Sequence, residues 1–149
     1  METKVRSPSA RPLVEITSGY QLDRQDLSGL FLYVVELESA SEGVPDAFTL
    51  SDIVRDVRNR IAASDMGVLE LLDTRLMETG YFEGDGYDDP HCMICGVQAY
   101  AVEEDFPRIA QGSLPAGIPD VRYRLDLQCC GDFEIGTQQM ITALQGGSG

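Results

Sequence analysis

The stretch that decides the fold is residues 1–37, which contain Met1-Glu2-Thr3-Lys4-Val5, Pro12-Leu13-Val14-Glu15-Ile16 and the apolar run Leu30-Phe31-Leu32-Tyr33-Val34-Val35-Glu36-Leu37. The first of these segments has the pattern of a strand, and the period of two puts Glu2 and Lys4 on one face. Phosphodiester hydrolysis uses such a pair, because a carboxylate helps to hold a divalent cation and a lysine orients or deprotonates the attacking water. Two solvated side chains are the alternative interpretation, since 24% of the chain is charged.

The segments that follow predict a central strand and two helices. The run from Leu30 to Leu37 suits a strand that is covered on both faces. Thr49-Leu50-Ser51-Asp52 has the pattern of a capping box, and apolar residues then recur at helical spacing. A second helix is predicted over about residues 67–79, with Gly80 as its stop. We expect the two helices to form an antiparallel pair packed beside the sheet.

The rest of the chain predicts two more strands, Cys92 to Glu103 and Val121 to Gln128, and a short helix over Gln138 to Leu144. We predict a single domain over residues 1–135, followed over residues 136–149 by the terminal helix and a flexible Gly/Ser tail. The residues that we expect in the core are Leu32, Val34, Ile53, Val57, Leu69, Leu72 and Leu125.

The order of these segments resembles a bacterial family with a PD-(D/E)xK motif, related to restriction-endonuclease-like nucleases. The likeness covers roughly Glu2 to Asp132, and the matching segments include Glu2-Thr3-Lys4-Val5, Gln21-Leu22-Asp23, Tyr33-Val34-Val35-Glu36-Leu37, Tyr100-Ala101-Val102 and Phe106-Pro107-Arg108-Ile109. The resemblance implies an α/β fold: a partial restriction-endonuclease-like core with a mixed sheet and a packed helical pair. It also implies Mg²⁺-dependent hydrolysis of DNA, with Glu2 as metal ligand and Lys4 as catalytic lysine.

The resemblance further implies a short helix within residues 18–28, with Gln21 near the active-site side. The family's upstream half, including the Asp of its Pro-Asp element, has no counterpart here, because the chain begins one residue before Glu2. We therefore expect the C-terminal part of such a protein, with catalysis impaired in this form. Glu15 and Asp23 are candidates for the missing carboxylate. Pro45-Asp46 is not, because it precedes a helix, where Pro-Asp usually marks a turn.

Charge is distributed unevenly along the chain. Residues 1–24 carry four basic and three acidic side chains, a net of +1, which leaves −15 of the total of −14 for residues 25–149. Since nucleic-acid binding depends on neutralising phosphates, we expect DNA to bind near the first 24 residues or to a region upstream. Arg6 and Arg11 are expected to point outward from the loop of residues 7–12, toward phosphates or water. Arg55, Arg58 and Arg60 could contact a phosphate, but a solvated face paired with Asp52 and Asp56 is favoured.

Two other motifs invite a metal interpretation. His91-Cys92-x-x-Cys95, with Cys129 and Cys130, has part of a zinc-ligand pattern, but strand alternation puts Cys92 and Cys95 on opposite faces. Small buried thiols are the favoured interpretation. The acidic segment from Glu83 to Asp89 lacks the EF-hand order of ligands and is predicted to be a flexible surface loop.

Three functions stay open, so the sequence leaves undecided whether the chain is an enzyme. The first is the nuclease-like part described above, with Mg²⁺ and DNA. The second is a non-catalytic module that assembles with a protein partner, for example in a bacterial phage-defence system. The third is an acidic mimic of nucleic acid, which the basic beginning of the chain disfavours. No apolar run of 18 residues and no leader pattern occurs, so we expect a soluble cytoplasmic protein without a membrane partner.

Overall fold

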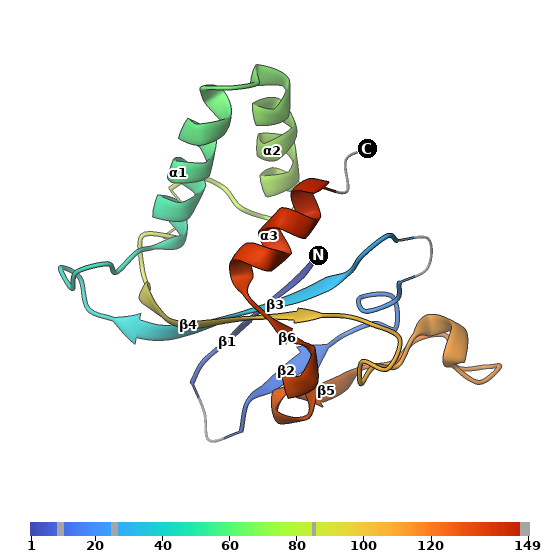
Figure 1. Ribbon diagram of the computed structural model, residues 1–149. Coiled ribbons are helices and arrows are strands. Elements are labelled where there is room, and N and C mark those ends of the chain that lie inside the picture. Colours follow the sequence, from blue (N-terminus) through green and yellow to red (C-terminus); the bar gives the residue numbers. More distant parts are fainter. Residues whose placement is uncertain (9–10, 25–26, 85, 147–149) are drawn as a thin grey trace. The chain divides into compact units, whose positions relative to one another are not determined.

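The computed structural model describes residues 1–8, 11–24, 27–84 and 86–146 (Figure 1). The chain divides into two compact units, one made of Met1–Leu37 and Ile94–Gly149 and the other of Glu38–Met93. The single domain that we expect over residues 1–135 stays a prediction.

The main sheet has four strands in the order β1-β3-β4-β6. Strand β1 (Glu2–Arg6) runs parallel to β3 (Phe31–Ala40), whereas β4 (His91–Ala101) and β6 (Glu134–Ile135) are antiparallel. A second sheet pairs β2 (Leu13–Ile16) with β5 (Tyr123–Asp126) in antiparallel fashion. The mixed main sheet and the helices confirm the predicted α/β fold.

The core of the first unit is built from both sheets. Leu32 and Val34 of β3 and Ile16 of β2 are completely buried, and Leu125 of β5 is 5% exposed. These residues belong to one cluster, which also contains Val14, Leu22, Leu30, Tyr100, Val102, Phe106, Leu127 and Cys130. The structure therefore confirms three of the predicted core positions, Leu32, Val34 and Leu125.

Three short elements complete the first unit: the 3-10 helices η1 (Gln111–Ser113) and η2 (Leu127–Phe133), and helix α3 (Thr137–Gly146). Helix α3 confirms the predicted terminal helix, and its Met140 is 3% exposed. The expected tail, residues 147–149, lies outside the described residues. The described residues within 18–28 form turns and bends, so the short helix implied there is wrong for them. Ser9, Ala10, Gln25 and Asp26, which fall in the loop and helix predictions, are also not described.

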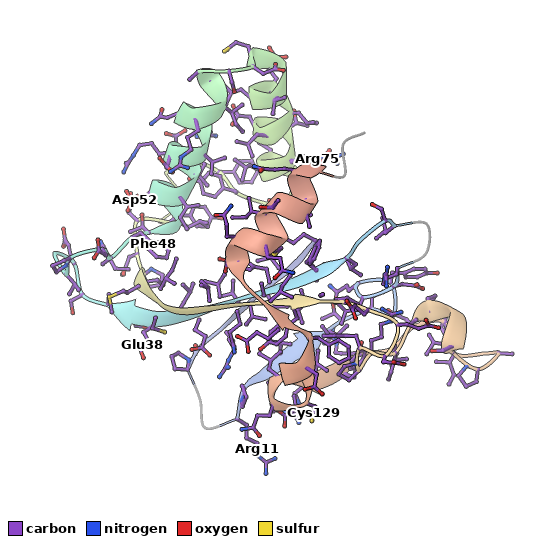
Figure 2. All side chains as sticks on the ribbon, in the orientation of Figure 1. Arg11, Glu38, Phe48, Asp52, Arg75 and Cys129 are labelled. Carbon is purple, nitrogen blue, oxygen red and sulfur yellow. The ribbon has the colours of Figure 1, made fainter. Side chains whose placement is uncertain are left out.

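The second unit contains two helices, α1 (Leu50–Ala62) and α2 (Met66–Glu78), which contact each other. The predicted capping box is present: the Asp52 N–H donates to Thr49 Oγ1 at 3.1 Å, and the Thr49 N–H donates to Asp52 Oδ2 at 2.9 Å. The hydrogen bonds from Thr49 lower the pKa of Asp52, which Figure 2 labels near the beginning of α1. Gly80, with φ of 86°, follows α2 as expected.

The predicted helical core is only partly correct. Ile53 is 43% exposed, so its prediction is wrong, and the neighbouring Val54 is buried instead. Val57, Leu69 and Leu72 are only half-buried, and α2 contains no buried residue. Apolar residues surround much of α2, so periodicity alone could not identify the residues that another element covers. No helix in the described part of the chain is long and apolar enough to cross a membrane.

The arginines of α1 pair with carboxylates. Arg55 contacts Asp52 and Arg60 contacts Asp56, as predicted for a solvated face. Arg58 instead donates to Asp73 of α2 at 2.7 Å and to Glu83 at 2.9 Å, and these hydrogen bonds raise its pKa. Arg58 therefore joins α1 to α2 and to the acidic segment of residues 83–89, of which Asp85 is not described.

The cysteines differ in burial. Cys130 is completely buried, and this burial raises the pKa of its thiol to about 11. Cys92 is half-buried, whereas Cys95 and Cys129, the latter labelled in Figure 2, are exposed. The prediction of buried thiols is therefore correct for Cys130 and wrong for Cys95 and Cys129. Cys95 lies at a solvent-facing position of β4, and Cys129 lies on the solvent side of the η2 turn.

Candidate active site

Strand β1 turns its charged residues toward the core. In the register with β3, Glu2 lies beside Leu32, Lys4 beside Val34 and Arg6 beside Glu36. Neighbouring residues in register share a face of the sheet, so these charged side chains lie on the face of the buried Leu32 and Val34. The alternate residues Thr3 and Val5 are exposed, Val5 by 64%. The burial pattern is therefore the reverse of that of an ordinary half-buried strand.

The structure brings Glu2 and Lys4 together, as the period of two predicts. Lys4 Nζ lies 3.3 Å from Glu2 Oε1, and the two side chains are 15% and 25% exposed, respectively. A lysine ammonium that is largely withdrawn from water needs acceptors, because desolvation disfavours its charge. The Glu2 carboxylate supplies one acceptor and leaves part of its own surface open to solvent.

Gln21 supplies a second acceptor for the same ammonium. Lys4 Nζ donates to Gln21 Oε1 at 3.1 Å, which places Gln21 at the site as the resemblance implies. The N–H of Thr17 also donates to Gln21 Oε1, at 2.8 Å. Because both partners are donors, the amide oxygen, not its NH₂ group, must face them. The side chain of Gln21 is thus held in one orientation, and it directs the Lys4 ammonium in turn.

The turn that carries Gln21 is anchored on both sides. Leu22, the next residue, is completely buried in the core. Gly19 lies so close to Gln111 that an added Cβ would be 2.8 Å from Gln111 Oε1, and the Gln111 N–H donates to the Gly19 carbonyl at 3.2 Å. A larger residue at position 19 would push these segments apart. Gly19 and Leu22 therefore set the place of Gln21.

Arg6 does not point outward, and that expectation is wrong. Its side chain is 7% exposed, and its Nη1 lies 2.7 Å from Glu36 Oε1. Arg6 is an even-numbered residue of β1 and follows the strand's alternation, so it faces inward with Glu2 and Lys4. This ion pair was not predicted from the sequence. The signal that could have indicated it is Glu36, a charged residue within an otherwise apolar run.

The two acids proposed as substitutes for the missing carboxylate lie in different surroundings. Glu15 is on the exposed face of β2, opposite to the buried Val14 and Ile16, and its Oε1 lies 3.7 Å from Arg122 Nε. This face of β2 does not bring Glu15 to the Lys4 ammonium. Asp23 is half-buried and lies two residues after Gln21 in the anchored turn. Among the described residues, no group of three or more His, Cys, Asp or Glu side chains could hold a metal ion.

The site therefore consists of a carboxylate, an ammonium and a fixed amide on one inward face. A carboxylate oxygen such as that of Glu2 is a ligand that Mg²⁺ or Mn²⁺ prefers. The ammonium of Lys4 can donate to an attacking water or to a phosphoryl oxygen.

Comparison with known protein families gives a match over most of the chain. Residues 1–128 match the family that is described as "Putative PD-(D/E)XK family member, (DUF4420)". No curated protein and no solved structure matches the chain.

Proposed function

The chain belongs to this PD-(D/E)XK family, and from that membership we propose that Glu2 and Lys4 are part of a metal-dependent site that hydrolyses DNA phosphodiester bonds. The observation that carries the proposal is the reversed pattern of β1, which holds two opposite charges side by side on its inward face. Such burial costs desolvation energy, and hydrophobic residues would stabilise the fold as well or better. A catalytic role explains why charged side chains, and not apolar ones, occupy the inward face of β1.

Each residue has one role in this proposal. Glu2 would hold the divalent cation, and Mg²⁺ when bound would polarise a phosphoryl oxygen of the substrate. Lys4, held as an ammonium by Glu2 and Gln21, donates to the attacking water and orients it. Gln21 is a positioning residue, because the Thr17 N–H fixes the amide oxygen that receives the Lys4 ammonium.

A complete site requires more oxygen ligands than Glu2 provides, since Mg²⁺ prefers six. Among the described strands, β1 lies at an edge of the main sheet, so its outer side can pair with a further strand. A carboxylate opposite Glu2 on such a strand would have its Cβ about 4.5–5.5 Å from that of Glu2. By the family's pattern, this carboxylate is the Asp of the Pro-Asp element, so we expect the chain alone to be impaired.

Plasmid cleavage in the presence of Mg²⁺ tests the proposal. We expect the chain alone to cut no faster than its Lys4→Ala variant, and a form with a Pro-Asp strand joined ahead of Met1 to cut measurably. Glu2→Gln and Lys4→Ala should abolish that gain, because charge stabilisation by the site supplies several kcal/mol of the rate. Glu15→Gln is the matched control, because Glu15 faces away from the site. A gain that persists in Lys4→Ala contradicts the proposal, and strong cutting by the chain alone would assign the second carboxylate to Asp23.

A second candidate function is assembly with a protein partner in a cytoplasmic phage-defence system. The observation that favours it is helix α2, which has no buried residue and leaves Met66 and Leu71 exposed by 61% and 57%. Leu71→Lys should then weaken co-purification of the partner and leave cleavage by the joined form unchanged. Cleavage that falls together with co-purification would argue against a separate assembly role.

A further inference from the structure

We infer that Arg6, Glu36 and Gly96 lock the register of β1 on β3 and so keep Glu2 and Lys4 on the inward face. The lock concerns how the strand is placed, and it holds whether or not Glu2 and Lys4 perform catalysis. Arg6 and Glu36 are therefore positioning residues for the site.

The side-chain pattern of β1 favours a different register. A slip of one residue along β3 would turn every side chain of β1 to the opposite face. Thr3 and Val5 would then face the buried Leu32 and Val34, and Lys4 and Arg6 would face outward. Hydrophobic burial favours this slipped arrangement, since Val5 is 64% exposed in the observed one. Some specific interaction must therefore hold the observed register.

The Arg6–Glu36 ion pair is that interaction. The two residues are partners in the register, and Arg6 Nη1 lies 2.7 Å from Glu36 Oε1. The Arg6 side chain is 7% exposed and that of Glu36 is 24% exposed, so water screens the pair only weakly. After a slip of one residue, Arg6 would leave this face and Glu36 would lose its nearby cation. The slip would give up the attraction between these two weakly screened charges, so the pair opposes the slip.

Gly96 makes room for the carboxylate of the pair. A Cβ at position 96 would lie 3.0 Å from Glu36 Oε2, which is closer than side chains normally approach. Residue 96 lies in β4, the other neighbour of β3, so the lock spans three adjacent strands. Together with Pro8, Pro12, Val97 and Gln98, the three residues line a hollow of about 340 Å³.

The lock matters because none of the five residues of β1 is a buried apolar residue. The strand pairs with β3 and with no other strand among the described residues, so it is a short edge strand, and its Val5 points outward. Lys4 is two residues from Arg6, so both face the same way and lie about 6.6 Å apart along the strand. An interaction that holds Arg6 on the inward face therefore also keeps the Lys4 ammonium within hydrogen-bonding distance of Gln21.

Methyl-labelled NMR of the full chain tests this inference, with the nuclear Overhauser contacts between Val5 and Val34 methyl groups as the readout of register. In the wild type, Val5 and Val34 are on opposite faces, and their methyl groups should show no contact. Arg6→Ser combined with Glu36→Ser removes both charges and leaves no buried charge alone. We expect Val5 to gain contacts with Val34, or the β1 amides to exchange with solvent about tenfold faster or more.

Two further variants separate the lock from a general effect on folding. Arg6→Lys keeps a cation opposite Glu36 and should retain the wild-type contacts, whereas Gly96→Ala crowds Glu36 and should give an intermediate result. The methyl contacts between Val14 and Leu125 report whether the core is intact, because these two core residues are register partners in the paired strands β2 and β5. The inference is overturned if the double Ser variant keeps an intact core and its β1 residues show the same methyl contacts and the same amide exchange rates as the wild type.

Discussion

Strands β1 and β2 belong to the same unit and have opposite patterns of burial. In β2, Val14 and Ile16 are buried and Glu15 is exposed, which is the ordinary pattern of a strand with one wet face. In β1, Lys4 faces inward and Val5 faces solvent. The difference teaches that β2 is placed by hydrophobic burial, whereas β1 is placed by ion pairs and a hydrogen bond. A functional site is expected at a strand whose charged residues face inward and whose apolar residue faces solvent.

The largest effect should come from an inward residue of β2. Ile16→Ala removes a completely buried side chain from the core, so we expect the free energy of unfolding to fall by about 2–5 kcal/mol. Chemical denaturation monitored by circular dichroism would measure the change. Glu15→Ala on the exposed face of the same strand is the control, with an expected change within about 0.5 kcal/mol. Similar losses of unfolding free energy for Ile16→Ala and Glu15→Ala would contradict the conclusion that β2 is placed by burial of one face.

An intermediate effect should come from Tyr100, a buried residue with a polar hydroxyl on strand β4 of the main sheet. Burial, followed by the nearby Glu134, raises the pKa of the phenol from 10 to about 12. Because the folded pKa is the higher one, this stabilisation is fully present below pH 10 and is lost as the pH rises through about 12. The loss should reach about 2–3 kcal/mol in unfolding free energy.

Tyr100→Phe isolates that effect, because Phe cannot ionise. Its unfolding free energy should fall less between pH 9 and pH 12 than that of the wild type. If the unfolding free energies of the two proteins fall equally over this pH range, the pKa of Tyr100 does not differ between the folded and unfolded states. Tyr20→Phe, at a ring that is 67% exposed, is the matched control.

The smallest of the three main effects on stability should come from Lys4, one of the inward residues of β1. Lys4→Met replaces an ammonium by an apolar side chain of similar length, so we expect unfolding free energy to change by no more than about 1 kcal/mol, and to rise if it moves. The Glu2 carboxylate keeps contact with water, so it tolerates the loss of its partner. A loss of 3 kcal/mol or more would mean that β1 depends on Lys4 for its stability as β2 depends on Ile16.

Local patterns predicted much of this fold. The capping box of Thr49 and Asp52, the terminal helix and the shared face of Glu2 and Lys4 follow from spacing within a few residues. The burial of Leu32 and Val34 likewise follows from the apolar run of residues 30–37, and that of Leu125 from the alternation of apolar and charged residues along its strand.

The parts that sequence patterns missed depend on distant contacts. The Arg6–Glu36 pair follows from a parallel register between segments 30 residues apart, which no local pattern specifies. The turn of Gln21 is held in place partly by Gln111, far along the chain. Ile53 was wrongly assigned to the core because periodicity shows that a helix has an apolar face and does not show what covers it.

The most direct test of the proposed site is to locate bound Mn²⁺ in the chain by its broadening of NMR signals. We expect weak binding, because Glu2 alone supplies too few oxygen ligands, and broadening centred on residues 2–4 and on Gln21. Glu2→Gln should remove this broadening, and Glu15→Gln should leave it unchanged. Broadening centred on the acidic segment of residues 83–89, or broadening near β1 that survives Glu2→Gln, would contradict the assignment of Glu2 as metal ligand.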